Sequence, residues 1–291
     1  MTTGSSPSAH RLLERGASEL RAAGVPDARF EAELLLSHAL GWSREALLAR
    51  LHEPASAESA GYYFQLVERR RGRVPLQHIL GTQEFFGLTF HVTPAVLIPR
   101  PETEGVVEEA LAELSSLSPK GPSIADVGCG SGCIAIALAH EMPDAQLFAI
   151  DASPAALAVA RENALRHGVG ERITFLHGDL LEPLVERKER VDAVVTNPPY
   201  VIDDEIPELA PEVAEHEPRL ALAGGADGLD TIARLLRGVG AVLESGGLVV
   251  MEIGKGQEDS VKRLVRESGL EHLRVAPDLA GIPRVVVARK T

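Results

Sequence analysis

Four consecutive residues, Asn197-Pro198-Pro199-Tyr200, offer groups that suit chemistry on a planar NH2 group. They follow residues 192–196, a β-branched run that predicts a buried strand ending at the prolines, because proline has no backbone N–H. In open α/β sheets, ligands bind at such carboxyl ends. The Asn197 side chain and the Pro198 carbonyl supply two acceptors, and the Tyr200 ring supplies a flat wall. A turn that only closes a strand explains the prolines but not Asn197 and Tyr200, so we expect the tetrapeptide to bind substrate and Asn197 to be catalytic.

A glycine-rich run at residues 128–132 forms a second candidate site, between a predicted strand at 123–127 and an apolar helix at 134–139. Glycines in this position permit a tight turn and a close approach of a ligand to the backbone. The spacing is G-x-G-x-G, with Cys133 where a dinucleotide fingerprint has its last glycine. This departure argues against nicotinamide binding and favours a ligand without pyrophosphate. The predicted cofactor loop comprises Gly128, Cys129, Gly130, Ser131 and Gly132.

Acidic residues follow several predicted strands. Asp151 ends the strand at 146–150, about twenty residues after the glycine loop, where a carboxylate can accept both hydroxyls of a ribose. The alternative for Asp151 is an acid at a helix entry. Asp126 and Asp179 are similar, and for them ligand and structural roles stay equally open. The two cysteines of the chain, one helical turn apart, are too few for a structural zinc site, so we interpret them as small buried residues and expect no metal.

Helical spacing of apolar residues predicts a small bundle before residue 80. The first helix covers residues 9–23, and a second begins after Asp27 as its cap and ends at Gly41. Ser43 opens a third, and a fourth runs through residues 62–67 into the arginines at 69–73. We interpret the arginine run as a solvated helix end favoured by the dipole, with an acidic or ribosomal contact as the alternative. This region is assigned to substrate recognition as domain 1–80.

Residues 81–99 contain aromatic and β-branched residues separated by glycine and proline, which predicts a β-hairpin linker. After it, strands and helices alternate: the acid-rich start of a helix at 98–104, strands at 123–127, 146–150, 173–176 and 192–196, and further strands at 248–253 and 284–288. Helices are expected between them, from Ser153 to a stop at Gly168, at 229–243 and at 258–267. The pattern predicts an α/β fold, a Rossmann-like doubly wound domain spanning 100–291.

The composition and the charge distribution argue against several classes of function. The 291 residues are 45% hydrophobic and 24% charged, as in globular proteins. No apolar run approaches the ~20 residues of a membrane span, and the start lacks the pattern of a secretory signal, so we expect a cytoplasmic protein. Residues 1–80 hold 10 Lys and Arg against 9 Asp and Glu, which leaves 19 against 33 in residues 81–291. Such an acidic region is a poor binder of DNA phosphates, and direct DNA binding is not expected.

The glycine loop, Asp151, residues 179–180 and the tetrapeptide, in this order, resemble class I methyltransferases that use S-adenosylmethionine. A narrower resemblance is to the bacterial protein-glutamine methyltransferases that act on peptide-chain release factors. It covers the α/β domain and linker well and the helical part loosely. The segments that carry it are Arg73 to Gly81, Ile98 to Glu104, Glu217 to Leu222, Gly224-Gly225, Asp227 to Asp230, and Glu252 to Gly254 with Gln257.

The resemblance implies that the chain methylates the side-chain amide nitrogen of the GGQ-motif glutamine in class 1 release factors, leaving S-adenosylhomocysteine. It also implies that residues 128–132, Asp151, Leu180 and Asn197 contact the cofactor, and that residues 197–200 hold the glutamine. The family often has Trp at the position of Leu180, so stacking on adenine is lost here. No general base is identified. Alternatives are a ribosomal-protein glutamine methyltransferase, a DNA adenine amino methyltransferase and a noncatalytic cofactor-binding module.

Overall fold

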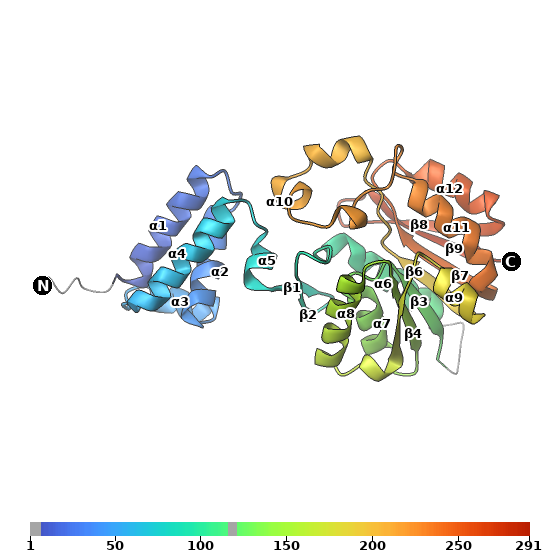
Figure 1. The fold of residues 1–291 in the computed structure, drawn as a ribbon, viewed down its shortest axis with the longest axis horizontal. Coiled ribbons are helices and arrows are strands. Elements are labelled where there is room, and N and C mark those ends of the chain that lie inside the picture. Colours follow the sequence, from blue (N-terminus) through green and yellow to red (C-terminus); the bar gives the residue numbers. More distant parts are fainter. Residues whose placement is uncertain (1–6, 116–120) are drawn as a thin grey trace, which may run out of the picture. The chain divides into compact units, whose positions relative to one another are not determined.

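The computed structural model describes residues 7–115 and 121–291, which form two compact units (Figure 1). The helical unit comprises the described residues up to Gly81 together with Pro211–His216. The sheet unit comprises Thr82–Ala210 and Glu217–Thr291. The division differs in two places from the domains expected from sequence. The hairpin expected as a separate linker belongs to the sheet unit, and six residues from the loop after the tetrapeptide belong to the helical unit.

Apart from the last one, α10, the helices of the helical unit all contribute to one apolar core. These helices are α1 Ala9–Ala22, α2 Ala28–Leu40, α3 Arg44–Ala49, α4 Ala57–Arg71, α5 Leu76–Leu80 and α10 Pro211–Ala214. Ser43 caps α3 as predicted, because its hydroxyl accepts from the backbone N–H of Ala46. Asp27 precedes α2 but has a left-handed backbone, and its side chain makes no capping hydrogen bond within the described residues, so its predicted capping role was wrong. The five-residue α5 was not predicted, because so short a helix shows no apolar periodicity.

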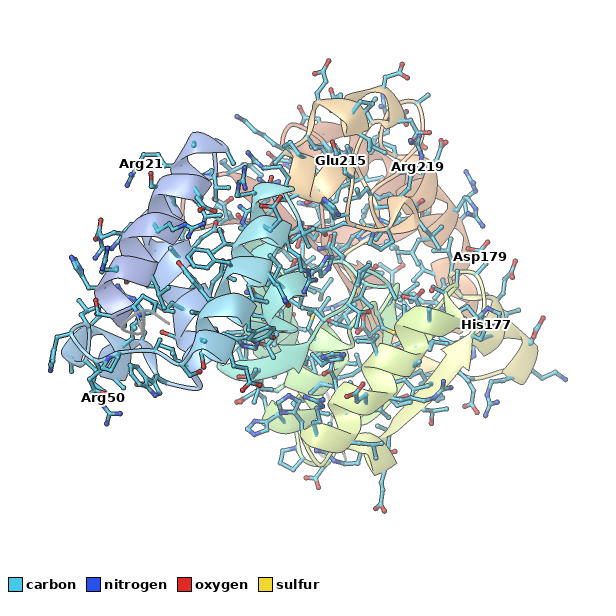
Figure 2. All side chains as sticks on the ribbon, turned by 60° about the vertical axis from the view of Figure 1, so that its left-hand side comes forward. Arg21, Arg50, His177, Asp179, Glu215 and Arg219 are labelled. Carbon is cyan, nitrogen blue, oxygen red and sulfur yellow. The ribbon has the colours of Figure 1, made fainter. Side chains whose placement is uncertain are left out.

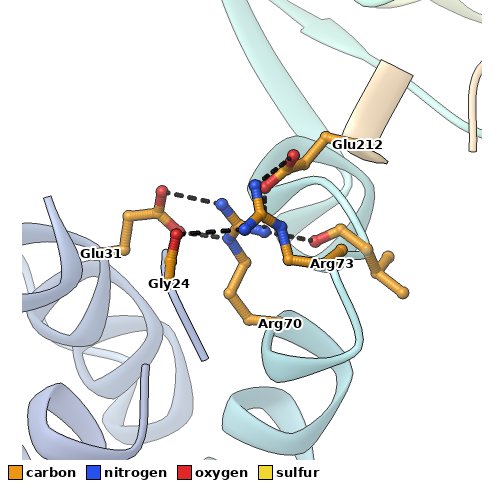
Figure 3. Close-up of polar contacts among 6 residues, drawn as sticks. Gly24, Glu31, Arg70, Arg73 and Glu212 are labelled. Carbon is orange, nitrogen blue, oxygen red and sulfur yellow. Dashed lines mark hydrogen bonds and ion pairs between the residues drawn. The ribbon is translucent and has the colours of Figure 1, made fainter. Parts of the chain in front are cut away.

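The arginine run at the end of α4 is not simply solvated, as the sequence had suggested. The Arg70 side chain is only 4% exposed and forms ion pairs with Glu31 and with Glu212, the latter at 2.7 Å (Figure 3). Arg73 donates to Glu212 Oε2 at 2.7 Å and to the Gly24 carbonyl at 3.0 Å. The acidic contact that remained as the alternative is therefore made inside the protein, by Glu31 and Glu212.

The sheet unit contains a seven-stranded sheet in the order β5-β4-β3-β6-β7-β9-β8. Strands β3 to β7 run parallel, and β9 is antiparallel to its neighbours β7 and β8. The strands are β3 Ser123–Val127, β4 Gln146–Asp151, β5 Ile173–His177, β6 Val191–Thr196, β7 Leu243–Glu252, β8 Leu270–Pro277 and β9 Pro283–Lys290. The Rossmann-like α/β class is confirmed. Strand β8 was not predicted, because it lies at the sheet edge and is mostly half-buried, which leaves little apolar alternation.

Helices cover both faces of this sheet (Figure 1). Alternate strand residues point to opposite faces, so Ile124 packs in a core with α6, α7 and α8, whereas Ala125 packs in a second core with α9, α11 and α12. The helices are α6 Glu104–Leu114, α7 Cys133–Glu141, α8 Pro154–Arg166, α9 Glu182–Arg187, α11 Asp230–Val242 and α12 Glu258–Glu267. Short 3-10 turns occur at Pro101–Thr103, Gly170–Arg172, Asp203–Glu208 and Arg219–Ala221.

The predicted hairpin is present as β1 Thr82–Phe85 paired antiparallel with β2 Leu88–His91. Asn163 of α8 holds it to the sheet unit: the amide accepts from the backbone N–H of His91 and donates to the carbonyls of His91 and Ser131. The hairpin is thereby tied to the glycine loop. Among the described residues, no helix combines the length and the apolarity that crossing a membrane requires.

The register of the parallel strands fixes where the candidate site lies. Val127 is paired with Ile150 on one side and with Thr196 on the other, and Thr196 is paired with Met251. The glycine loop, Asp151, Asn197 and Glu252 therefore leave the sheet at the same carboxyl edge, where ligands bind in open α/β sheets.

Candidate active site

The glycine loop turns sharply between β3 and α7. Gly128 and Gly130 have positive φ values of 73° and 54°, and no described atom lies within 4 Å of where a Cβ would stand on either residue. The backbone there faces open space that a ligand can approach. Gly132 differs, because a Cβ on it would stand 3.1 Å from Ala160 Cβ. Its missing side chain therefore allows close packing of α8 on the loop.

The other loop residues are turned inward. Cys129, Ser131 and Cys133 are buried, as the sequence suggested for the cysteines. Burial raises the pKa of the Cys129 thiol well above its usual range and that of Cys133 to about 12, so both stay protonated and poorly nucleophilic. The backbone N–H of Gly128 and that of Cys129 both donate to the Ile150 carbonyl. The loop is thus tied to the end of β4.

Asp151, at the end of β4, organises the turns on either side of it. Its Oδ2 accepts from the backbone N–H of Gly130 at 2.9 Å, and its Oδ1 accepts from the backbone N–H of Ser153 at 2.8 Å. A carboxylate has about four lone-pair sites, so each oxygen can still accept one hydroxyl. The geometry is therefore compatible with both roles of Asp151. It accepts from backbone N–H groups as an acid at a helix entry, and its remaining lone pairs can accept from ribose hydroxyls.

Asp126 and Asp179 occupy different environments. Asp126 is fully buried, and its Oδ2 accepts from the backbone N–H of Ala135 at 3.0 Å. Its Oδ1 has no hydrogen-bond partner among the described residues. Burial raises the pKa of Asp126 to about 7, and the nearby Asp151 adds to the shift. Asp179 lies beside His177 at the surface (Figure 2), is 45% exposed and forms an ion pair with Arg234.

Leu180 follows Asp179 in a left-handed backbone conformation with φ 50°. Such a conformation is unfavourable for a leucine and persists where the surroundings hold it. The side chain is partly buried and packs against the core shared with α9 and α11. Its apolar contact surface suits the wall that was expected for adenine, although the cofactor contact itself stays a prediction.

The tetrapeptide begins directly after β6, as predicted. Asn197 Nδ2 donates to Thr103 Oγ1 at 2.9 Å, and Thr103 Oγ1 in turn donates to Glu252 Oε2 at 2.6 Å. The other oxygen of Glu252 accepts from the Tyr200 hydroxyl at 3.0 Å. The residue types alone did not assign Thr103 and Glu252 to the site. The available signal was an acid at the carboxyl end of an otherwise apolar strand, β7.

Glu252 is a buried carboxylate, 1% exposed. Burial raises its pKa above the usual range, although the hydrogen bonds from Thr103 and Tyr200 oppose the shift. Burial, and then the proximity of Glu252, also raise the pKa of the Tyr200 hydroxyl, so Tyr200 stays protonated and donates. Perturbed titrating groups grouped at a sheet edge are typical of functional sites.

Segments far apart in the sequence hold the tetrapeptide in place through hydrogen bonds and close packing. Gln257 Nε2 donates to the carbonyls of Tyr200 and Gly228, and its Oε1 accepts from the backbone N–H of Gly254 at 2.8 Å. Gly224 packs so closely that a Cβ would meet the Tyr200 carbonyl carbon at 2.9 Å. Four of the segments singled out in the sequence therefore meet at one place.

Glu217 forms a second support. Its buried carboxylate accepts from Arg100 Nη2 at 2.6 Å and from the backbone N–H of Ile98 at 3.4 Å. The segment that follows Glu217 is also paired with the tetrapeptide's extension, because the backbone N–H of Val201 donates to the Leu222 carbonyl. The stretch before α6 and the loop after β6 are thus fixed to each other.

Comparison with known proteins gives two family matches. Residues 11–81 match the PrmC N-terminal domain, and residues 109–225 match the Methyltransferase small domain. A release factor glutamine methyltransferase of Moorella thermoacetica is 47% identical over 96% of this chain and 97% of its own length. The protein of the same name in Geobacter sulfurreducens is 44% identical over 96% of this chain and 95% of its own length.

Solved structures show the same fold in more distant proteins. The hMettl16 catalytic domain matches with a TM-score of 0.56 at 16% identity, over 77% of this chain and 81% of that chain. The Thermus thermophilus 16S rRNA methyltransferase RsmC, determined with AdoMet and guanosine, has a TM-score of 0.51 at 21% identity, over 72% and 50%. At this level of identity, the likeness concerns the fold alone.

Proposed function

The chain belongs to the release factor glutamine methyltransferase family, and from this premise we propose that it methylates the glutamine of the GGQ motif in class 1 peptide-chain release factors. The acceptor atom is the side-chain amide nitrogen of that glutamine. The observation that carries the proposal is the tetrapeptide at the carboxyl edge of β6. There Asn197 uses its NH2 group on Thr103, which leaves its Oδ1 to accept from a substrate amide.

The residues at the sheet edge also fit S-adenosylmethionine. Gly128 and Gly130 leave open space along the loop, and both oxygens of Asp151 retain lone pairs for the ribose. Leu180 would pack against the adenine, and Asn197 would border both cofactor and substrate. When bound, this cofactor supplies the sulfonium methyl group and leaves as S-adenosylhomocysteine.

The chain's own residues contribute positioning. An amide nitrogen is a poor nucleophile because its lone pair is shared with the carbonyl, so alignment is the main requirement. Acceptance of the two amide hydrogens by Asn197 Oδ1 and the Pro198 carbonyl would orient the nitrogen and stabilise positive charge that develops on it. The same acceptors disfavour a carboxylate substrate, since a buried acceptor would then lack a donor.

We propose that the helical unit recognises the protein substrate. Because release factors act in translation, we also propose that the enzyme works in the cytoplasm. Removing residues 1–80 should raise the KM for folded release factor far more than the KM for the cofactor. Because Arg70 and Arg73 hold Glu212, the truncated chain must first be shown to unfold cooperatively. Equal efficiency of a folded truncated chain and the full chain would contradict this assignment.

The decisive experiment offers labelled methyl donor together with release factor, ribosomes or DNA in separate reactions. Label should enter the release factor, and mass spectrometry should place it on the glutamine of the GGQ motif. A release factor with that glutamine changed to alanine is the matched control. Label on a ribosomal protein instead would support the first alternative, and label on DNA would overturn the protein-substrate proposal.

A further inference from the structure

Thr103 and Glu252 form a hydrogen-bonded chain that reaches both ends of the tetrapeptide. Thr103 lies directly before α6 and touches Asn197 Nδ2, and Glu252 ends β7 and touches the Tyr200 hydroxyl. The two are joined by the Thr103 hydroxyl bond to Glu252 Oε2. Three separate segments of the chain thus converge on residues that the proposed function places against the substrate.

The direction of each hydrogen bond in this chain follows from the number of protons available. A threonine hydroxyl has one proton, and here it is directed at a carboxylate oxygen. Toward Asn197, Thr103 Oγ1 can therefore only accept, so the group of Asn197 that faces it must be the NH2 group. The Oδ1 of Asn197 is consequently directed away from Thr103. An inverted amide would place two acceptors against each other.

Glu252 is able to set this direction because both of its oxygens receive a hydroxyl. Tyr200 donates to Oε1 and Thr103 donates to Oε2, and the carboxylate is buried. The charged groups that act on it are Arg284, which favours its ionised form, and Glu102, which opposes it. Arg284 is itself paired with Asp278 at 3.2 Å, so none of the cations that the structure describes is committed to Glu252 alone.

We propose that Glu252, acting through Thr103, is a positioning residue that fixes the orientation of the Asn197 amide and presents its Oδ1 to the substrate. The proposal rests on the proposed function and adds two residues outside the tetrapeptide to it. Neither residue touches the reacting atoms. Their effect is to select one of the two amide orientations, which differ in whether a donor or an acceptor meets the substrate NH2 group.

The test uses the full chain with isosteric variants. Thr103→Val removes the hydroxyl but keeps the shape, and Glu252→Gln leaves an amide that can accept from only one of the two hydroxyls. Each should lower single-turnover methyl transfer to release factor by roughly tenfold to a hundredfold, the range expected for one well-placed hydrogen bond. Cofactor affinity measured by calorimetry should stay within about twofold, and Thr103→Ser should restore the rate.

Glu113→Gln is the matched control, because Glu113 is a largely buried carboxylate near the end of α6 that pairs with Arg274 and Arg289. It lies ten residues after Thr103, which corresponds to roughly 15 Å of helix. The turnover of the Glu113→Gln variant should equal that of the wild type. Additivity provides a further criterion: in an Asn197→Ala background, Thr103→Val should cause almost no further loss, because there is no amide left to orient.

A spectroscopic measurement separates this proposal from the proposed function. With 15N-labelled asparagine, the side-chain NH2 signals of Asn197, assigned by their loss in Asn197→Asp, should shift and exchange faster with solvent in Thr103→Val. Unchanged signals, or turnover of Thr103→Val and Glu252→Gln within about twofold of wild type, would overturn the positioning role while leaving the methylation intact. If the wild type labels no release factor, the proposed function fails, and the NMR comparison still decides the orientation of Asn197.

Discussion

Glu212 of the helical unit, a partly buried carboxylate, and the fully buried acids Asp126 and Glu252 of the sheet unit are held in opposite ways. In the helical unit, Glu212 receives both Arg70 and Arg73; burial tends to raise its pKa, but the arginines more than offset this and lower it to about 2 (Figure 3). In the sheet unit, Asp126 and Glu252 form no ion pair with a described residue, and burial raises the pKa of each. Glu212 and its two arginines thus stabilise the structure, whereas Asp126 and Glu252 lie near the carboxyl edge of the sheet, where the chemistry is proposed.

This contrast has a physical reason. Cations beside a buried carboxylate stabilise its ionised form, and the ion pair then stabilises the fold. A buried carboxylate without a cation destabilises the fold whenever it is ionised. Proteins retain groups of the second kind where function requires them, and stability is lower there than elsewhere. The contrast therefore predicts that ionised Glu212 stabilises the fold, that ionised Asp126 destabilises it, and that changes at Asn197 and Asp151 act on turnover or binding.

The largest expected effect concerns Asp126. Its folded pKa of about 7 exceeds the ordinary value of 3.8, so the folded state binds the proton more tightly than the unfolded state. Its contribution is fully present below pH 3.8 and is lost as the pH rises through 7, by up to about 4 kcal/mol at 1.36 kcal/mol per pKa unit. Urea unfolding at several pH values should show this slope in the wild type and not in Asp126→Asn. Parallel curves for the two proteins would show that Asp126 is ionised at little cost.

Glu212 should show the opposite sign with a smaller magnitude. Its folded pKa of about 2 lies below the ordinary value of 4.5, so its contribution is present above pH 4.5 and is lost as the pH falls through 2. Glu212→Gln should lower the free energy of unfolding at pH 7 by about 2 to 3 kcal/mol. Glu68→Gln, which breaks the exposed pair with Arg71, is the control and should change it by about 0.5 kcal/mol or less. Equal losses in the two variants would remove the special role of the Glu212 pair.

Asn197→Ala should affect turnover and not stability. Loss of one buried acceptor for the substrate amide should cost about 1.5 to 3 kcal/mol in the transition state, or roughly ten- to several-hundred-fold in turnover. The prolines and β6 remain, so the melting temperature should stay close to that of the wild type. Single-turnover transfer at saturating cofactor and release factor measures the effect. A rate within about threefold of wild type would remove the amide-orienting role from the tetrapeptide.

Asp151→Ala should have the smallest effect and should act on binding. Loss of the ribose acceptor is expected to weaken S-adenosylmethionine roughly tenfold, or about 1.4 kcal/mol, in titration calorimetry. The glycine loop also loses the hydrogen bond from Gly130, so the comparison with Asp151→Asn, which keeps one acceptor oxygen, separates the two contributions. Tighter binding of NAD than of S-adenosylmethionine by the wild type would contradict the assignment of the loop.

Much of the fold could be predicted from the sequence because local signals were strong. The apolar runs ending at Thr196 and Val127 predicted strands, and the alternation with helices predicted the α/β class, which the structure confirms. Strand β8 and helix α9 were missed, since a half-buried edge strand and a six-residue helix carry weak periodicity. The antiparallel direction of β9 was also not predicted, because strand direction depends on pairing with distant residues.

The candidate site divides in the same way. The sequence by itself determined the tetrapeptide, the glycine loop and Asp151, because their chemistry and position after strands are encoded within a few neighbouring residues. Only the tertiary structure decided that Thr103 and Glu252, 149 residues apart, share a hydrogen bond and that Thr103 also accepts from Asn197. The tertiary structure also decided that Arg70 forms a buried ion pair with Glu212 and is not part of a solvated helix end. Hydrogen bonds and ion pairs act over a few ångströms in space, and spacing along the chain does not reveal which distant residues folding brings that close.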